Sequence, residues 1–242
     1  ILITAGKTAE LVVVDPATAA VRQRVPLPRT TYPPAPSENV LRPDKDGQLS
    51  YTGLRFSPDG RRAFLSDVNG SVVLLDVAGD ATLSVSRAIP LPDARAPRRR
   101  EEIPAGLAVS PDGKTLYVCG NLSNTLLELE VASGRVLRVF DVGVAPFDVV
   151  LAGGKAYVSN WGGRRPGPGE LTGPAGRGTV VKVDPVRHVA SEGSVTVIDL
   201  QSGKPVAEIV TGLHASALVA SPSGRHVVCA NAASDTLSVI DT

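Results

Sequence analysis

The side chains best suited to bind a ligand gather at the start of a Gly- and Pro-rich stretch. Trp161, the single tryptophan of the chain, is followed by Arg164 and Arg165. An indole and two guanidinium groups can together hold a carboxylate, a phosphate or a sugar. We therefore take these three residues as candidate binding residues. In the competing interpretation, Trp161 packs the stretch onto the protein and both arginines face water.

Two further candidates come from a histidine and from a basic run. His214 directly precedes an apolar run that we predict to be a strand, and Arg99 is the middle one of three successive arginines. Such a run could hold an acidic partner. The carboxylates of Glu101 and Glu102 follow at once, so a solvated, self-paired loop is the alternative.

Motifs of catalysis and of cofactor binding do not occur in the sequence. The histidines His188, His214 and His226 are far apart and lack His-x-His or His-Glu-x-x-His spacing. There is no Gly-x-Ser-x-Gly elbow, and the glycines after Trp161 do not lie between a strand and a helix, where a phosphate-binding loop would. Cys119 and Cys229 are interpreted as small buried thiols. We predict no catalytic residue, no metal and no cofactor.

The charge and hydropathy of the chain exclude other classes of partner. The net charge is +1, and the basic clusters lack interleaved aromatic residues, so we expect no binding to nucleic acid. No run of about 18 apolar residues occurs, so no helix should span a membrane. The sequence shows no signal peptide and contains no methionine, and we interpret its start as a processed or cloned boundary.

A sequence repeat supplies the elements that must position the candidate residues. Two short apolar runs joined by a tight turn recur at 54–66, 107–119, 149–159 and 218–229. The turn is Ser-Pro-Asp-Gly in the first two, where Pro presets φ, Asp can bond nearby backbone and Gly accepts a positive φ. Each stretch is therefore a predicted β-hairpin. Two more apolar runs follow each hairpin, and four antiparallel strands in about 40 residues are typical of a β-propeller blade.

Two columns of the repeat are predicted to be structural. One is acidic and ends the third strand, where a carboxylate can accept N–H groups of the following turn; its members are Asp15, Asp76, Asp199 and Asp241. The other is small and indicates a tight contact between blades; its members are Thr4, Ser66, Cys119, Ser159 and Cys229.

We predict an all-β chain, residues 1–242, that forms a single β-propeller domain of four-stranded antiparallel blades. Complete blades are expected at 51–91, 104–142 and 146–210, the last with a loop insertion at 162–192, and partial blades at 1–27 and 214–242. Because a blade buries its faces against both neighbours, we expect the chain to be part of a larger ring. Closure of a small ring by the two partial blades is the alternative.

The repeat also carries a family likeness. The segment Val109–Val118, the asparagines Asn121 and Asn124, and the run 230–242 resemble the repeat of bacterial YVTN-repeat (YncE-like) β-propellers. This resemblance implies a ring of seven blades, of which the chain holds only a part, and a periplasmic or extracellular location. The stretch 159–165 with its long loop is similar to members in which the propeller precedes a phosphoesterase domain. The resemblance therefore implies such a domain as a partner beyond residue 242.

The long connections are predicted to share one face of the ring. Antiparallel order places 28–50, 92–103 and 162–192 at the end opposite the Ser-Pro-Asp-Gly turns, and binding residues concentrate on such loops. We expect a non-catalytic scaffold or binding module that presents this loop-rich face to a partner domain, a small anionic ligand or a protein. One alternative is a hydrolase or lactonase-like propeller enzyme with its site at the ring mouth. A second is a cell-surface or S-layer-associated adhesion module, and tolerated surface insertions would explain the loops without any function.

Overall fold

The chain is described here by a computed structural model that covers residues 2–5, 10–27, 49–97, 99–175 and 179–242. Strands and connecting turns make up these ranges, which contain no helix, and therefore none that could cross a membrane. The predicted all-β class is confirmed.

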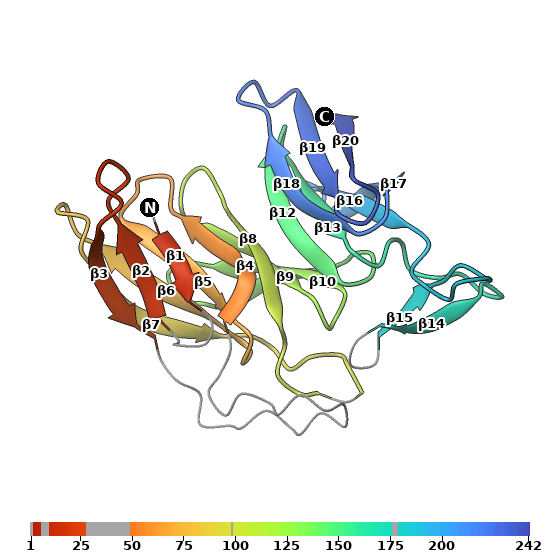
Figure 1. Cartoon of the computed structure of the whole chain (residues 1–242), viewed down its shortest axis with the longest axis horizontal. Coiled ribbons are helices and arrows are strands. Elements are labelled where there is room, and N and C mark those ends of the chain that lie inside the picture. Colours follow the sequence, from red (N-terminus) through yellow and green to blue (C-terminus); the bar gives the residue numbers. More distant parts are fainter. Residues whose placement is uncertain (1, 6–9, 28–48, 98, 176–178) are drawn as a thin grey trace.

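Five antiparallel sheets follow one another along the chain, and each is ordered as in the sequence (Figure 1). The four-stranded sheets are β4 (Leu49–Phe56), β5 (Arg62–Asp67), β6 (Ser71–Val77) and β7 (Leu83–Pro90); β8 (Pro104–Val109), β9 (Thr115–Gly120), β10 (Thr125–Glu130) and β11 (Val136–Asp141); and β12 (Pro146–Ala152), β13 (Lys155–Asn160), β16 (Gly193–Asp199) and β17 (Lys204–Thr211). The three-stranded sheets are β1 (Leu2–Ala5), β2 (Glu10–Val14) and β3 (Val21–Pro26), and β18 (Ala215–Ala220), β19 (His226–Asn231) and β20 (Thr236–Asp241). A further pair, β14 (Thr172–Ala175) and β15 (Thr179–Lys182), lies within the insertion.

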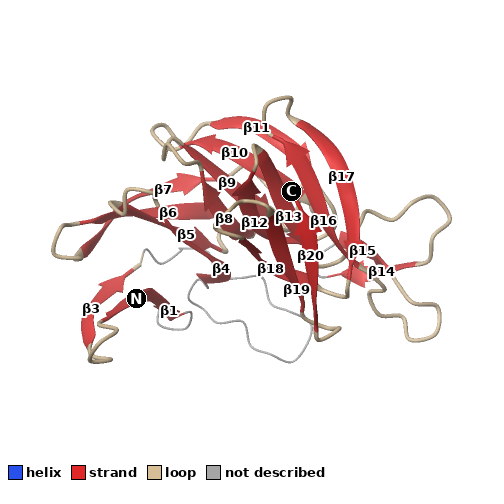
Figure 2. Cartoon of the chain, turned by 90° about the horizontal axis from the view of Figure 1, so that it is seen from above, coloured by secondary structure: helices blue, strands red, loops and turns tan. Residues whose placement is uncertain are grey.

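The sheets are arranged radially. Their first strands β4, β8, β12 and β18 contact one another in turn and line a common axis, while β7, β11 and β17 lie outermost (Figures 1 and 2). The sheets are therefore β-propeller blades, as predicted. The β1–β3 and β18–β20 sheets lie at the two ends of an open arc (Figure 2).

Apolar residues hold each sheet against the next. Between the β8–β11 and β12–β17 sheets, for example, Leu126 and Phe140 lie in one cluster with Val149, Val158 and Ile198, all of them buried. Similar clusters occupy the other spaces between successive sheets. Full burial of one such side chain stabilises the fold by about 1.5–3 kcal/mol.

The Ser-Pro-Asp-Gly turns form as predicted. The Ser57 hydroxyl donates to Asp59 Oδ1 (2.5 Å), the same oxygen accepts the Arg61 N–H, and Gly60 has φ of 68°. The hydrogen bond from Ser57 is the largest of the influences that lower the pKa of the Asp59 carboxyl. The acidic column behaves similarly where Asp15 accepts the Ala17 N–H.

The small column joins neighbouring blades, with one correction. The Ser66 hydroxyl donates to the carbonyl of Ala105 on β8, and the Ser159 hydroxyl to that of Ser216 on β18. The prediction that Cys229 belongs to this column is wrong. Strand pairing places Cys229 opposite Leu218, so that it faces the preceding blade, and its neighbour Ala230 takes the column position.

Two of the long connections share one end of the blades. The N–H of Arg95, in the 92–103 connection, donates to the Ser123 hydroxyl in the β9–β10 turn, and Arg165 of the insertion donates to the Asn124 carbonyl in the same turn. The predicted common face is thus confirmed for these two. Residues 28–48 of the third connection lie outside the described residues.

Candidate functional site

Three aromatic side chains meet at the mouth of the ring. Trp161 follows β13 and His214 precedes β18, yet their ring centroids are 4.6 Å apart with the planes tilted by 49°. Phe147, on the inner strand β12, lies 6.5 Å from Trp161. We call these three residues the mouth cluster.

Backbone hydrogen bonds fix both halves of the mouth cluster. The Trp161 N–H donates to Ala145 O, which extends the β12–β13 pairing, and Ala232 donates to His214 O. His214 has φ of 55°, a left-handed conformation that positions its ring over the indole. Trp161 remains 45% exposed, so part of its side chain is accessible from solvent. An aromatic face of this kind can stack on a sugar-like ring, and an imidazole can exchange a proton near neutral pH.

An ion pair crosses the axis of the ring. From β4, the Arg55 guanidinium donates to Leu107 O on β8 and to Asp148 Oδ1 on β12 at 3.3 Å. Asp148 is buried and also accepts the Leu218 N–H of β18 at 3.0 Å. Burial raises the pKa of Asp148 despite these donors. Arg55 keeps 40% of its side chain exposed and therefore supplies a partly solvated positive charge on the axis.

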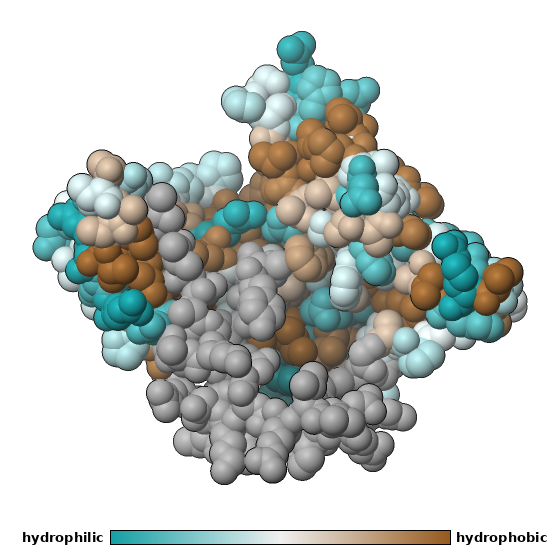
Figure 3. All heavy atoms as spheres, viewed as in Figure 1, coloured by the Kyte–Doolittle hydropathy of each residue, from teal (hydrophilic) through white to brown (hydrophobic). Residues whose placement is uncertain are grey.

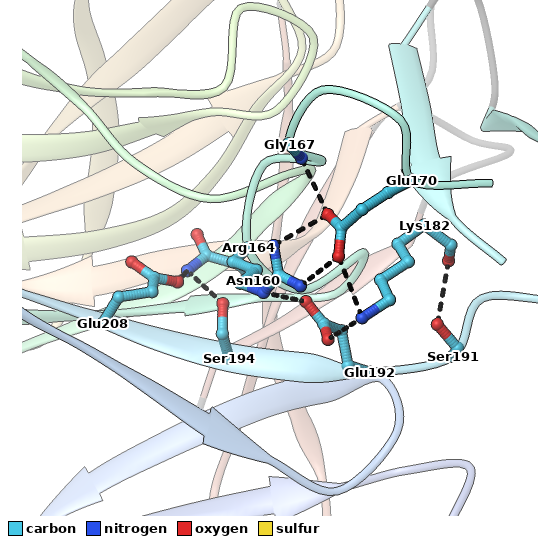
Figure 4. A network of polar contacts seen from close by, with 9 residues as sticks. All are labelled: Asn160, Arg164, Gly167, Glu170, Lys182, Ser191, Glu192, Ser194 and Glu208. Atoms are coloured by element: carbon cyan, nitrogen blue, oxygen red, sulfur yellow. Dashed lines mark hydrogen bonds and ion pairs between the residues drawn. The ribbon is translucent and has the colours of Figure 1, made fainter. Parts of the chain in front are cut away.

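Arg164 belongs to an ion-pair network at the base of the insertion (Figure 4). Its guanidinium donates to both oxygens of Glu170, at 2.5 and 2.9 Å, and lies 3.1 Å from Glu192. Lys182 Nζ approaches the same two carboxylates at 3.2 and 3.4 Å. The Arg164 hydrogen bonds are the main cause that lowers the pKa of Glu170 to about 2. The network holds the insertion together and uses much of the hydrogen-bonding capacity of Arg164.

Arg165 connects the insertion to the β8–β11 blade. Nε donates to Val142 O at 2.8 Å, and Nη2 donates to Asn124 O and to Asp141 Oδ1 at 2.7 and 3.0 Å. Arg95 approaches the same Asp141 carboxylate at 3.7 Å. Arg165 also lines a cleft of about 470 Å³, together with Arg164 and residues of β16 and β17.

Arg99 has a local structural role. It donates through Nε to Glu101 O and through Nη2 to Val68 O in the β5–β6 turn. The buried carboxylate of Glu102 accepts the N–H groups of Ile103 and Leu122. Arg99 therefore ties its connection to the β5–β6 turn, and Glu102 ties it to the β9–β10 turn.

The candidate residues predicted from the sequence lie in three separate parts of the structure. Trp161 and His214 come together at the mouth, Arg164 and Arg165 line the cleft, and Arg99 lies by the β5–β6 turn. Several residues of interest were missed by the sequence reasoning: Phe147, Arg55, Asp148 and Glu208. Only Arg55 and Asp148 gave a signal, as charged residues within apolar inner strands. Across the described ranges, no cluster of three or more His, Cys, Asp or Glu side chains could hold a metal ion.

Comparison with known proteins supports the fold. No protein-family model and no curated protein matches the sequence. Among solved structures, a protein from Bacteroides uniformis provisionally named a 6-phosphogluconolactonase superposes with a TM-score of 0.61 at 16% identity, over 99% of this chain and 65% of that one. A similarly named protein from Bacteroides fragilis gives a TM-score of 0.60 at 13% identity, over 96% and 60%. The chain thus spans less than two thirds of each of these lactonase-like all-β structures.

Proposed function

We propose that the chain is part of a lactonase-like propeller that binds a small cyclic ester at the ring mouth and hydrolyses it. The observation that carries the proposal is the contact between the half-exposed Trp161 indole and the His214 imidazole. The names of the two similar structures support the same reaction class by analogy of fold.

The mouth residues have complementary roles in this reaction. The indole of Trp161 stacks on the substrate ring, and the imidazole of His214 takes a proton from water as that water adds to the ester carbonyl carbon. The ring C–O bond then breaks, the leaving oxygen takes the proton back from the imidazolium, and a hydroxy acid results. The guanidinium of Arg55, held by Asp148 but partly exposed, is available to an anionic substituent of the substrate.

The proposal is tested by the hydrolysis of glucono-1,5-lactone and its 6-phosphate, followed by acid release. Asparagine tolerates a left-handed φ, so His214→Asn removes the base with little strain. We expect kcat to fall by about 10²- to 10⁴-fold, and Trp161→Ala to raise KM. His188, which also has φ of 55°, gives the matched control His188→Asn. No rate above the spontaneous reaction, or equal rates for the two histidine variants, would refute the proposal.

A second candidate is a scaffold whose insertion docks a partner domain, such as the phosphoesterase implied by the resemblance. Apolar side chains of the insertion are 47–83% exposed beside charged ones (Figure 3); they are Leu171, Val180, Val186 and Val189. Exposed apolar groups of this kind favour contact with another protein. The double change Val180→Ser and Val186→Ser should abolish co-purification with that domain supplied separately, and should leave lactone hydrolysis intact.

A further inference from the structure

The cleft beside Arg165 is separate from the mouth cluster. It lies between the end of β11 and the outermost strand β17, and neither Trp161 nor His214 lines it. Its lining includes Arg164 and Arg165 from the insertion, Thr196 and Glu208 from β16 and β17, and the apolar residues 205–207. Its volume of about 470 Å³ suits a small molecule.

The carboxylate of Glu208 is held in place by uncharged hydrogen-bond donors. Thr196 lies opposite Glu208 in the β16–β17 pairing, and its hydroxyl donates to Glu208 Oε2 at 2.7 Å. Asn160 Nδ2 lies 3.3 Å from Oε1, and both Thr196 and Asn160 are almost fully buried. Among the described residues, no cation forms an ion pair with Glu208. The carboxylate is therefore fixed in position without a direct ion pair, and the positive charge of Arg164 in the lining acts on it only through space while bonded to Glu170 and Glu192.

Close packing keeps this support rigid. The Gly143 N–H donates to Thr196 Oγ1 at 3.2 Å. A Cβ at Gly143 would lie 2.5 Å from both Asn160 Cγ and Gly163 O, so any side chain there would displace the amide beneath Glu208.

Arg165, which also lines the cleft, is fixed by hydrogen bonds. Its Nε and Nη2 atoms are engaged by two backbone carbonyls and by Asp141, and these contacts leave the two N–H groups of Nη1 for another acceptor. Its side chain is 47% exposed. A guanidinium held in this way can bind a carboxylate with little further loss of conformational entropy.

We propose that this cleft binds a small zwitterion of the amino-acid class, with its carboxylate on Arg165 and its ammonium group on Glu208. The charged residues of the lining, Arg164, Arg165, Asp141 and Glu208, balance one another, which favours a ligand of no net charge over a simple anion. The apolar wall at 205–207 faces the aliphatic part of the ligand. The assignment does not depend on catalysis at the mouth.

The test is calorimetric titration of the chain with glycine, L-alanine, L-leucine, L-lysine and L-glutamate, and separately with acetate and methylamine. We expect at least one amino acid to bind more tightly than either half-ligand. Glu208→Gln keeps the size and the hydrogen bonds and should weaken that binding about tenfold or more, since a charge-assisted bond is lost. Glu130→Gln, which removes a half-buried carboxylate of the neighbouring blade outside the cleft lining, should leave it unchanged.

A second variant tests the cleft independently, in case Glu208→Gln does not fold. Val206→Trp fills the cleft from an exposed strand position, and it should abolish binding with no change in the midpoint of thermal unfolding. Absence of binding by every amino acid, equal binding of acetate, or full affinity in both variants would overturn the proposal. Lactone hydrolysis should be unaffected by either change.

Discussion

Asp148 offers the most direct test of how the blades are held together. Its carboxylate accepts N–H groups from Val149 and from Leu218, which belongs to the next blade, and it also pairs with Arg55. Asp148→Ala leaves two buried N–H donors without an acceptor, at a cost of about 1–3 kcal/mol each. Removal of a desolvated charge offsets part of this loss, and Arg55 can regain water. We therefore expect a loss of about 2–4 kcal/mol in the free energy of unfolding at pH 7.

The dependence on pH separates the charge of Asp148 from its hydrogen bonds. Burial raises the pKa of Asp148 above the unfolded value of about 3.9. The folded state then holds the proton more readily than the unfolded chain does. As a result, the wild type gains stability relative to Asp148→Asn as the pH falls through the raised pKa, and the gain is complete below the unfolded value.

Urea unfolding, followed by the fluorescence of the single tryptophan, measures both effects at pH 7 and at pH 4. The Asn variant should lose less stability at pH 7 than the Ala variant, because its amide oxygen still accepts one N–H. Two results would refute the reasoning. One is an Asp148→Ala variant as stable as the wild type at pH 7. The other is a free energy of unfolding of the wild type, relative to that of Asp148→Asn, that is larger at pH 7 than at pH 4.

Three further predictions concern packing and the insertion. Ser159→Ala removes the hydroxyl between β12 and β18 and should cost about 1–3 kcal/mol in urea unfolding, whereas Ser133→Ala in an exposed turn should cost less than about 0.5 kcal/mol. Gly106→Ala places a Cβ 2.5 Å from the backbone of β12 and should destabilise the fold by about 3 kcal/mol or more, while Gly79→Ala, with nothing within 4 Å, should be tolerated. Because the pKa of Glu170 is lowered to about 2, this carboxylate and its ion pairs persist at pH 3. Pepsin at pH 3 should therefore spare residues 163–175 and 179–192 in the wild type and cleave them in Glu170→Gln.

The sequence was most informative where local chemistry determines the structure. Turn residues with a fixed φ, such as Gly60, and period-two strands predicted the four-stranded antiparallel blades, because both are properties of short segments. The error at Cys229 shows the limit of comparing side-chain size alone. A slip of one residue moves a side chain to the other face of the sheet. Counting from the turn, where Ser221 bonds His226 as Ser110 bonds Thr115, gives the correct register.

The site was less predictable because it depends on contacts between distant strands. Glu208 lies in an exposed outer strand and becomes a fixed carboxylate only through Thr196 and Asn160 of two other strands. The meeting of Trp161 with His214 likewise depends on how two blades pack. Nothing in the local sequence of either residue encodes that distance.

The two rims of the propeller differ in how much added length they should accept. At the Ser57–Arg62 turn, the Ser57 hydroxyl donates to Asp59 and accepts the Arg62 N–H, and the backbone of Ser57 bonds that of Gly60 and Arg62. A peptide tag inserted after Gly60 would break these bonds together and disturb the hairpin. At the opposite rim, the insertion has its own ion pairs and its own small core around Val181, so the blade below it is insulated from changes at its tip. An epitope or a fluorescent domain is therefore best introduced in the insertion, at the rim opposite the Ser-Pro-Asp-Gly turns, where a longer excursion is already part of the architecture.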